Sequence, residues 1–249
     1  MVEFPQYLSL HRYNYAFMES QTRKPSATRE FLVGAKDELP ILLGVAPFGM
    51  IYGVLATNAG LTSWSAQAMS SVVFAGSSQF MLVQLVNLGT PALIMIITGF
   101  VINLRHTLYS ASIAPYLRHL SPLWKLILSY FLTDEAYAVS IMHFQQRPDN
   151  HYKHWHLLGS GLALWTCWQL STAAGIFLGA QVPPNWSLDF TLALTFISLA
   201  VPAINDKASF FSALSAGLTA VLTRGLPFKL NLIAAAAVGI MVGLWSEKR

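Results

Sequence analysis

Residues 39–104 contain no Asp, Glu, Lys, Arg or His. A helix that crosses a bilayer needs about 20 mostly apolar residues, because the hydrocarbon layer is ~30 Å thick and the helix rises ~1.5 Å per residue. The run is long enough for about three such helices. The whole chain is 54% hydrophobic and 10% charged, whereas a soluble domain carries about 25% charged residues. These values favour an integral membrane protein over an unusually apolar soluble enzyme.

Apolar runs separated by turn residues predict seven to eight membrane spans. The eight candidates are 39–58, 65–87, 91–116, 123–144, 156–180, 188–204, 207–223 and 227–245. Gly, Pro, Asn and Ser occupy most of the joints, as steric preferences require. The sixth and seventh runs are short, so seven spans with one broken or re-entrant run stays open. We therefore predict an all-α polytopic bundle with some spans broken by Gly or Pro.

The distribution of charge predicts a polar N-terminal segment, residues 1–38, on the cytoplasmic side and a transport domain over residues 39–246. With eight spans and both termini inside, ten of the fifteen basic residues lie on the inner side. The net charge of +4 is not gathered on one face as in a nucleic-acid-binding protein, so no nucleic-acid partner is expected. The single cysteine forms no disulfide within the chain.

The first span is rich in helix-breaking residues. The segment "LPILLGVAPFGMIYG", residues 39–53, holds two prolines and three glycines. Pro47 removes a backbone donor and crowds the carbonyl four residues earlier, which favours a kinked or discontinuous helix. The alternative is that glycines such as Gly49 and Gly53 permit close packing between helices.

The second span carries a polar patch at its middle, formed by Gly76, Ser77, Ser78 and Gln79. A glutamine amide in lipid would leave its hydrogen-bonding atoms unsatisfied, at a cost of several kcal/mol. We expect Gln79 to face protein or a wet cavity. A helix broken here would present free backbone amides to a carboxylate, and the alternative is a hydrogen bond between helices.

The third span contains Arg105 and His106, and the fourth contains Asp134 and Glu135. A lone charge at the bilayer centre costs ~2.5–3.5 kcal/mol or more. We therefore predict that Arg105 pairs with one of the two acids in the bundle interior, and that the remaining carboxylate binds and releases a proton. His106 is a candidate relay, because histidine titrates near neutral pH. A purely structural ion pair and side chains that snorkel to water are the alternatives.

Two further segments have less specific patterns. His151, His154 and His156 form a loose metal-ligand spacing in a polar stretch, and a solvated loop is favoured over a metal site. The segment "VPAINDKASF", residues 201–210, is interpreted as a short loop, with a second break inside the membrane as the alternative. No catalytic residue, metal site or cofactor site is predicted.

Four segments together carry a resemblance: "APFGMIYG", "FAGSSQF", "NLRHTLYSASIAP" and "LTDEAYAV", in this order and spacing. They resemble the AzlC family, the large subunits of branched-chain amino-acid exporters. The resemblance covers roughly residues 30–245 and leaves residues 1–29 as an extension. It implies an inner-membrane, multi-pass secondary carrier that exports valine, leucine, isoleucine and sometimes methionine. It also implies a separate small membrane subunit of the AzlD type as partner.

The residues themselves suggest how such a carrier would work. Backbone amides of Gly76, Ser77, Ser78 and Gln79 would hold a carboxylate, with Gln79 and Asn103 as hydrogen-bonding side chains. Phe48, Met50 and Phe80 would line an apolar pocket for a branched side chain. Arg105, His106, Asp134 and Glu135 would form the coupling or gating group. We expect a proton gradient to drive transport, because titratable groups lie within spans and no nucleotide motif is present.

Two rival functions stay open. The chain would otherwise be a scaffold or channel-like subunit of a complex, or an integral membrane enzyme built on His106, Asp134 and Glu135. Residue types leave the preferred amino acid open as well, because one methylene in an apolar pocket changes binding by only ~1–3 kcal/mol.

Overall fold

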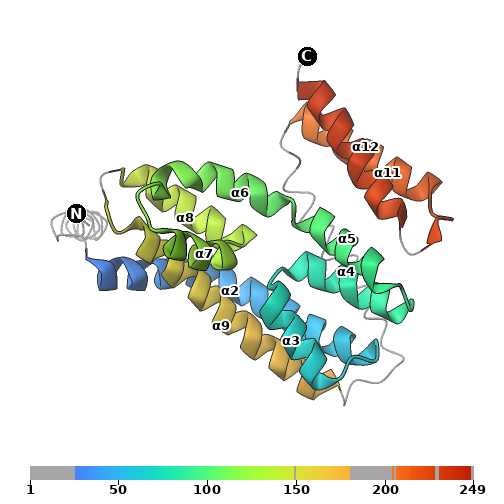
Figure 1. Cartoon of the computed structure of the whole chain (residues 1–249), viewed down its shortest axis with the longest axis horizontal. Coiled ribbons are helices and arrows are strands. Elements are labelled where there is room, and N and C mark those ends of the chain that lie inside the picture. The colour runs from blue at the N-terminus through green and yellow to red at the C-terminus, as the bar shows by residue number, and fades with distance from the viewer. Residues whose placement is uncertain (1–25, 149, 180–203, 205, 228–229, 248–249) are drawn as a thin grey trace, which may run out of the picture. The chain divides into compact units, whose positions relative to one another are not determined.

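The computed structural model describes residues 26–148, 150–179, 204, 206–227 and 230–247, and these residues form helices and turns without a strand (Figure 1). The predicted all-α class is therefore confirmed for the described residues. The helices are α2 (Ala27–Asn58), α3 (Ser63–Val73), α4 (Gly76–Asn87), α5 (Ala92–Asn103), α6 (Arg105–Ile113), the 3-10 helix η1 (Ala114–Leu117), α7 (Pro122–Phe131), α8 (Asp134–Gln146), α9 (Lys153–Gly179), α11 (Lys207–Leu222) and α12 (Leu230–Glu247).

Four helical segments in the described part of the chain are long and apolar enough to cross a membrane. They are Ala27–Asn58, Ala92–Leu117, Lys153–Gly179 and Leu230–Glu247, and α11 is apolar but shorter. The predicted total of seven to eight spans is not confirmed by this number. The expected span at 188–204, apart from Ile204, and most of the expected extension at 1–29 lie outside the described residues.

Two of the expected spans are each divided into two shorter helices. The run at 65–87 becomes α3 and α4, and the run at 123–144 becomes α7 and α8. Only the first of these breaks was expected, and neither occurs at a proline. The third span also loses its regular helix at Leu104, where the Thr107 amide donates to the Leu104 carbonyl three residues back at 3.0 Å.

The first span is an unbroken helix, so the predicted discontinuity is wrong. α2 continues through Pro40 and Pro47, and it begins at Ala27, ahead of the expected boundary at residue 38. Two of its glycines, Gly49 and Gly53, serve close packing instead. A Cβ added to Gly49 would lie 2.7 Å from the Ser171 Cβ, and one added to Gly53 would overlap the Thr172 carbonyl. The close-packing alternative explains the glycine spacing.

The chain divides into two compact units. Unit 1 contains the described residues up to Leu39 together with Ser112–Ala163, and unit 2 contains Pro40–Ala111 and the described residues from Leu164 onwards. α2 and α9 therefore each contribute their first part to unit 1 and their second part to unit 2.

Unit 1 is built on the first parts of α2 and α9, with α7 and α8. The α2 and α9 backbones approach so closely that a Cβ on Gly159 would overlap the Phe31 carbonyl, and one on Gly34 would overlap the His156 carbonyl. The side chains of Leu128, Phe144 and Leu157 are fully or almost fully buried. The short distance between the backbones fixes the register of polar side chains on the two helices.

In unit 2, the second parts of α2 and α9 also approach each other closely. This unit contains α3, α4 and α5 as well. A Cβ on Gly175 of α9 would overlap the Met50 carbonyl of α2. α11 and α12 lie side by side (Figure 1), where the Ser212 hydroxyl donates to the Gly239 carbonyl at 2.8 Å. Gly239 is tightly packed, because a Cβ there would lie 3.0 Å from the Ala216 Cβ.

Candidate functional site

The break between α3 and α4 has a specific backbone geometry. Phe74 adopts the left-handed conformation with φ of +37°, the only residue other than glycine with positive φ in the described chain. Its amide donates to the Ser70 carbonyl at 3.2 Å and ends α3. Ala75 is extended, and α4 begins at Gly76. Both Phe74 and Ala75 are buried, so the turn is held by protein and not by solvent.

The N-terminus of α4 is suited to bind an anion. Its first amide groups have no acceptor within the helix, and Ala75 provides no side-chain cap. The Arg105 Nη2 donates to the Ser77 hydroxyl at 2.7 Å, which places a guanidinium at the first turn of α4. A helix N-terminus and a guanidinium both favour negative charge. The predicted polar patch is thus the first turn of a helix, next to a fixed cation.

Gln79 is fully buried, as expected, against other side chains of unit 2. Its Oε1 accepts a hydrogen bond from the Trp168 indole N–H at 3.1 Å. Its Nε2 makes no hydrogen bond of standard geometry among the described residues, and the Gln79 side chain also interacts with Tyr52. The ring of Tyr52 stacks on Trp168 and meets Phe80 edge-on, each with centroids 6.2 Å apart. Gln79 therefore lies next to a buried aromatic cluster.

The other predicted substrate residues show fewer contacts with Gln79 and its aromatic neighbours. Asn103 ends α5, and its Oδ1 is buried without a hydrogen-bond partner in the described chain. Phe48 and Met50 are half-buried on α2. The hydrogen bonds and ring contacts described for unit 2 link Gln79 with Trp168 and its aromatic neighbours, and none of them involves Phe48 or Met50. Neither Trp168 nor Tyr52 was among the predicted substrate residues.

Asp134 and Glu135 were expected inside a continuous fourth span. They lie instead in the first turn of α8. Thr133 precedes them as N-cap, and its hydroxyl accepts from the Ala136 amide at 3.4 Å. Acidic side chains stabilise a helix N-terminus. The sequence signal for this break is Thr followed by two acidic residues, a typical helix start.

The predicted coupling group stays a prediction. Arg105 belongs to unit 2, whereas Asp134 and Glu135 belong to unit 1. His106 is half-buried, and its ring lies edge-on to Tyr109 with centroids 5.9 Å apart.

Unit 1 contains a buried polar cluster that the sequence analysis missed. It consists of Glu30, Asp37 and Glu38 from α2, His143 from α8 and His156 from α9. Both glutamates and both histidines are buried. His143 Nε2 lies 2.8 Å from Glu30 Oε2, and His156 Nε2 lies 3.1 Å from Asp37 Oδ2.

The cluster was missed because four of its members were assigned to polar segments, whereas His143 fell within the expected span 123–144 and was not singled out. The three acids lie within the expected tail at residues 1–38, and His156 was interpreted as part of a solvated loop. That interpretation is wrong for His156, which has no exposed surface and belongs to α9. In the sequence, charged residues next to an apolar run fit an exposed tail as well as the buried end of a helix.

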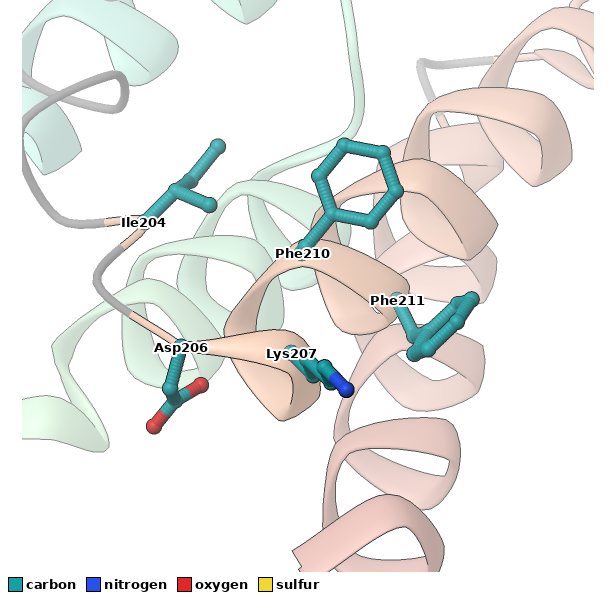
Figure 2. Close-up of a pocket in the computed structure, with 5 residues that line it drawn as sticks. All are labelled: Ile204, Asp206, Lys207, Phe210 and Phe211. Carbon is teal, nitrogen blue, oxygen red and sulfur yellow. The ribbon is translucent and has the colours of Figure 1, made fainter.

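The segment 201–210, which was expected to form a short loop, is helical from Lys207 onwards, where α11 begins, and residues 201–203 and 205 lie outside the described residues. Asp206 is the N-cap, and its Oδ1 accepts from the Ser209 amide at 2.6 Å, which lowers the pKa of that carboxyl. A pocket of about 630 Å³ is lined by Ile204, Asp206, Lys207, Phe210 and Phe211 (Figure 2). Figure 2 shows these side chains pointing in different directions. Because they do not converge, this pocket is a weaker candidate site than the start of α4.

Comparisons with known proteins identify the family. The family model described as AzlC protein matches residues 40–182, which is more than half of the chain. The chain belongs to the AzlC family. The match includes the α3–α4 break, Arg105 and the α7–α8 break.

Relatives span almost the whole chain. The inner membrane protein YgaZ of Escherichia coli is 25% identical over 91% of this chain and 95% of its own length. An uncharacterized membrane protein of Archaeoglobus fulgidus is 29% identical over 88% of this chain and 97% of its length. The branched-chain amino acid transport protein AzlC of Bacillus subtilis is 26% identical over 83% of this chain and 81% of its length. No solved structure matches. With its apolar helices, the chain is a membrane protein.

Proposed function

We propose that this chain is the large subunit of a proton-driven secondary transporter that exports branched-chain amino acids across the inner membrane. A family relative is named as a branched-chain amino acid transport protein. A small membrane subunit of the AzlD type completes the transporter. Valine, leucine and isoleucine are the substrates, with methionine as an additional one.

One observation carries the proposal: Arg105 contacts Ser77 at the start of α4, which has no side-chain cap. The α-carboxylate of an amino acid binds there, held by backbone amides of Gly76, Ser77 and Ser78 and by the guanidinium. In the proposal, the buried Nε2 of Gln79 donates a further hydrogen bond to the substrate. This site recognises the group that all amino acids share.

The side chain of the substrate requires an apolar surface next to that anion site. Phe80 follows Gln79 on α4 and is buried beside Tyr52. In the proposal, Phe48 and Met50 extend the surface, and Asn103 binds the substrate amino group through its buried Oδ1. A pocket of aromatic and thioether groups accepts several branched side chains, because methionine adapts its shape easily.

The test is counterflow of labelled valine in vesicles that contain the chain with its small partner subunit. Arg105→Gln removes the charge, and we expect apparent affinity to fall about ten- to a hundredfold, the equivalent of ~1.5–3 kcal/mol for a charge-assisted hydrogen bond. Arg118→Gln is the matched control, because Arg118 is an exposed arginine of unit 1. Unlabelled isobutylamine, which lacks a carboxylate, should not compete.

The same vesicles separate the proposal from its main alternative. A carrier accumulates valine against its gradient when a proton gradient is imposed, whereas a scaffold or channel-like subunit does not. Equal valine affinity in Arg105→Gln and the parent would refute the carboxylate site.

A further inference from the structure

The buried cluster of unit 1 has no role in the carboxylate site. Four of its side chains, Glu30, His143, His156 and Asp37, contact one another in that order, from α2 to α8 to α9 and back to α2. Glu30 is 1% exposed and contacts His143, which is 7% exposed. The ring of His143 stacks on the ring of His156, with centroids 3.8 Å apart and planes inclined by 16°. His156 has no exposed surface, and it contacts Asp37, which is 44% exposed.

The geometry points to a proton-binding site at the His143–His156 pair. Two positively charged imidazoles stacked this closely would repel each other, so the pair accommodates one proton. Each ring has its own carboxylate, Glu30 for His143 and Asp37 for His156. A proton on either ring is therefore balanced by an adjacent negative charge. The carboxylate of Asp37, which is 44% exposed, is the accessible end of the cluster.

Charged groups on every packed element define the surroundings of the pair. α2 contributes the three acids, and one oxygen of Glu38 accepts from the Ser160 hydroxyl. Arg147, after α8, lies 3.7 Å from the second oxygen of Glu30. Lys153 of α9 donates to the Pro148 carbonyl at 2.6 Å, and its ammonium lies over the Tyr116 ring. Glu135 of α8 interacts with Glu38 electrostatically.

A metal ion is the competing occupant, because ligand atoms of Asp37, His143 and His156 all lie within 4.8 Å of one another. The ring arrangement argues against it. The lone pair of an imidazole nitrogen lies in the ring plane, so two nearly parallel rings direct their lone pairs side by side. A zinc ion needs ligands that converge at ~2.0–2.1 Å. The stacked geometry thus favours a proton over a metal.

In the transport cycle, this site would couple substrate movement to the proton gradient, and that role rests on the proposed function. Proton binding by the histidine pair does not rest on the proposed function. It is measured first, by the ring signals of isotope-labelled histidine in the purified full-length protein between about pH 5 and pH 8. We expect one titration shared by two ring systems, which in both His143→Gln and His156→Gln is replaced by that of a single ring with its own carboxylate. His119→Gln, which removes an exposed histidine, should leave it unchanged.

Transport provides the second measurement, in the same vesicles and with labelled valine. In His143→Gln and His156→Gln, we expect accumulation driven by a proton gradient to fall about tenfold or more, with counterflow within about twofold of the parent. Counterflow requires substrate binding and exchange but no net proton movement. It also shows that the variants fold, and Asp37→Asn at the exposed end of the cluster is the milder companion variant.

Three results would overturn the inference. One is gradient-driven accumulation in both histidine variants with the pH profile of the parent. Another is the absence of a shared histidine titration. A third is stoichiometric zinc binding by the parent that both variants lose, which would assign the cluster to a metal. If the parent shows no valine counterflow at all, the proposed function fails while the histidine titration still decides whether the proton site exists.

Discussion

The α7–α8 break and the α3–α4 break differ in how the second helix of each pair begins. α8 starts with Thr133, whose side chain caps the helix, and with two acidic residues in its first turn. α4 starts after Ala75, which provides no side-chain cap, and Arg105 contacts its first turn through Ser77. α8 therefore satisfies its N-terminus with its own residues, whereas α4 leaves its first amide groups for another anion. This difference separates a break with a structural start from one suited to bind a ligand.

Both breaks lie beside the close contact of α2 with α9, so the largest effect should come from disturbing that contact. In unit 2, Gly175→Leu places a side chain on the Met50 carbonyl; in unit 1, Gly159→Leu places one on the Phe31 carbonyl. We expect each to lower the free energy of unfolding by more than ~3 kcal/mol, the upper end of typical overpacking. Thermal unfolding in detergent measures the effect.

Gly217→Leu is the matched control, because nothing lies within 4 Å of a Cβ at Gly217. Its unfolding temperature should stay near that of the parent. If Gly159→Leu unfolds like this control while Gly175→Leu does not, the two units do not depend equally on α2 and α9.

A smaller effect is expected at the buried glutamine of unit 2. Trp168→Phe keeps the aromatic packing but removes the indole N–H that donates to Gln79 Oε1. A buried acceptor without a donor costs ~1–3 kcal/mol of stability. The double variant Gln79→Leu with Trp168→Phe removes both partners and should recover most of that loss in the same unfolding assay. An equal loss in both proteins would mean that packing, and not the hydrogen bond, is the cause.

The smallest and most specific effects concern the two helix starts. Thr133→Ala removes the cap of α8 and should destabilise the protein by ~1 kcal/mol. Ala75→Ser adds a hydroxyl at an extended N-cap position of α4, which should stabilise the helix by a similar amount. If the start of α4 binds the substrate carboxylate, Ala75→Ser should also weaken valine binding, because the new hydroxyl competes for an amide group. Unchanged counterflow in Ala75→Ser would remove that distinction between the breaks.

Part of the fold could be predicted from residue patterns. The charge-free run from Leu39 to Leu104 indicated membrane helices, and the Gly76–Gln79 patch indicated where the second span is interrupted. Asn103 was expected beside that patch, but the contact of Arg105 with Ser77 was not predicted, because Arg105 was expected to pair with the acids of the fourth span. Tyr52 and Trp168 were not recognised as neighbours of Gln79, because nothing in residue spacing brings α2 and α9 to α4.

The predicted discontinuity at Pro47 failed for a different physical reason. Proline removes one hydrogen bond from a helix, but the close contacts of Gly49 and Gly53 with α9 hold the helix in place. Local preference favoured a break, and packing between helices outweighed it.

By itself, the sequence determined the helical class, the membrane environment and the family motifs, because each depends on composition or on local order along the chain. Tertiary structure alone decided which polar residues are buried together. Glu30 lies 113 residues before His143, yet it contacts His143, which stacks on His156, where close backbone contacts join α2 and α9. Such a meeting depends on the packing of whole helices, which no short segment encodes.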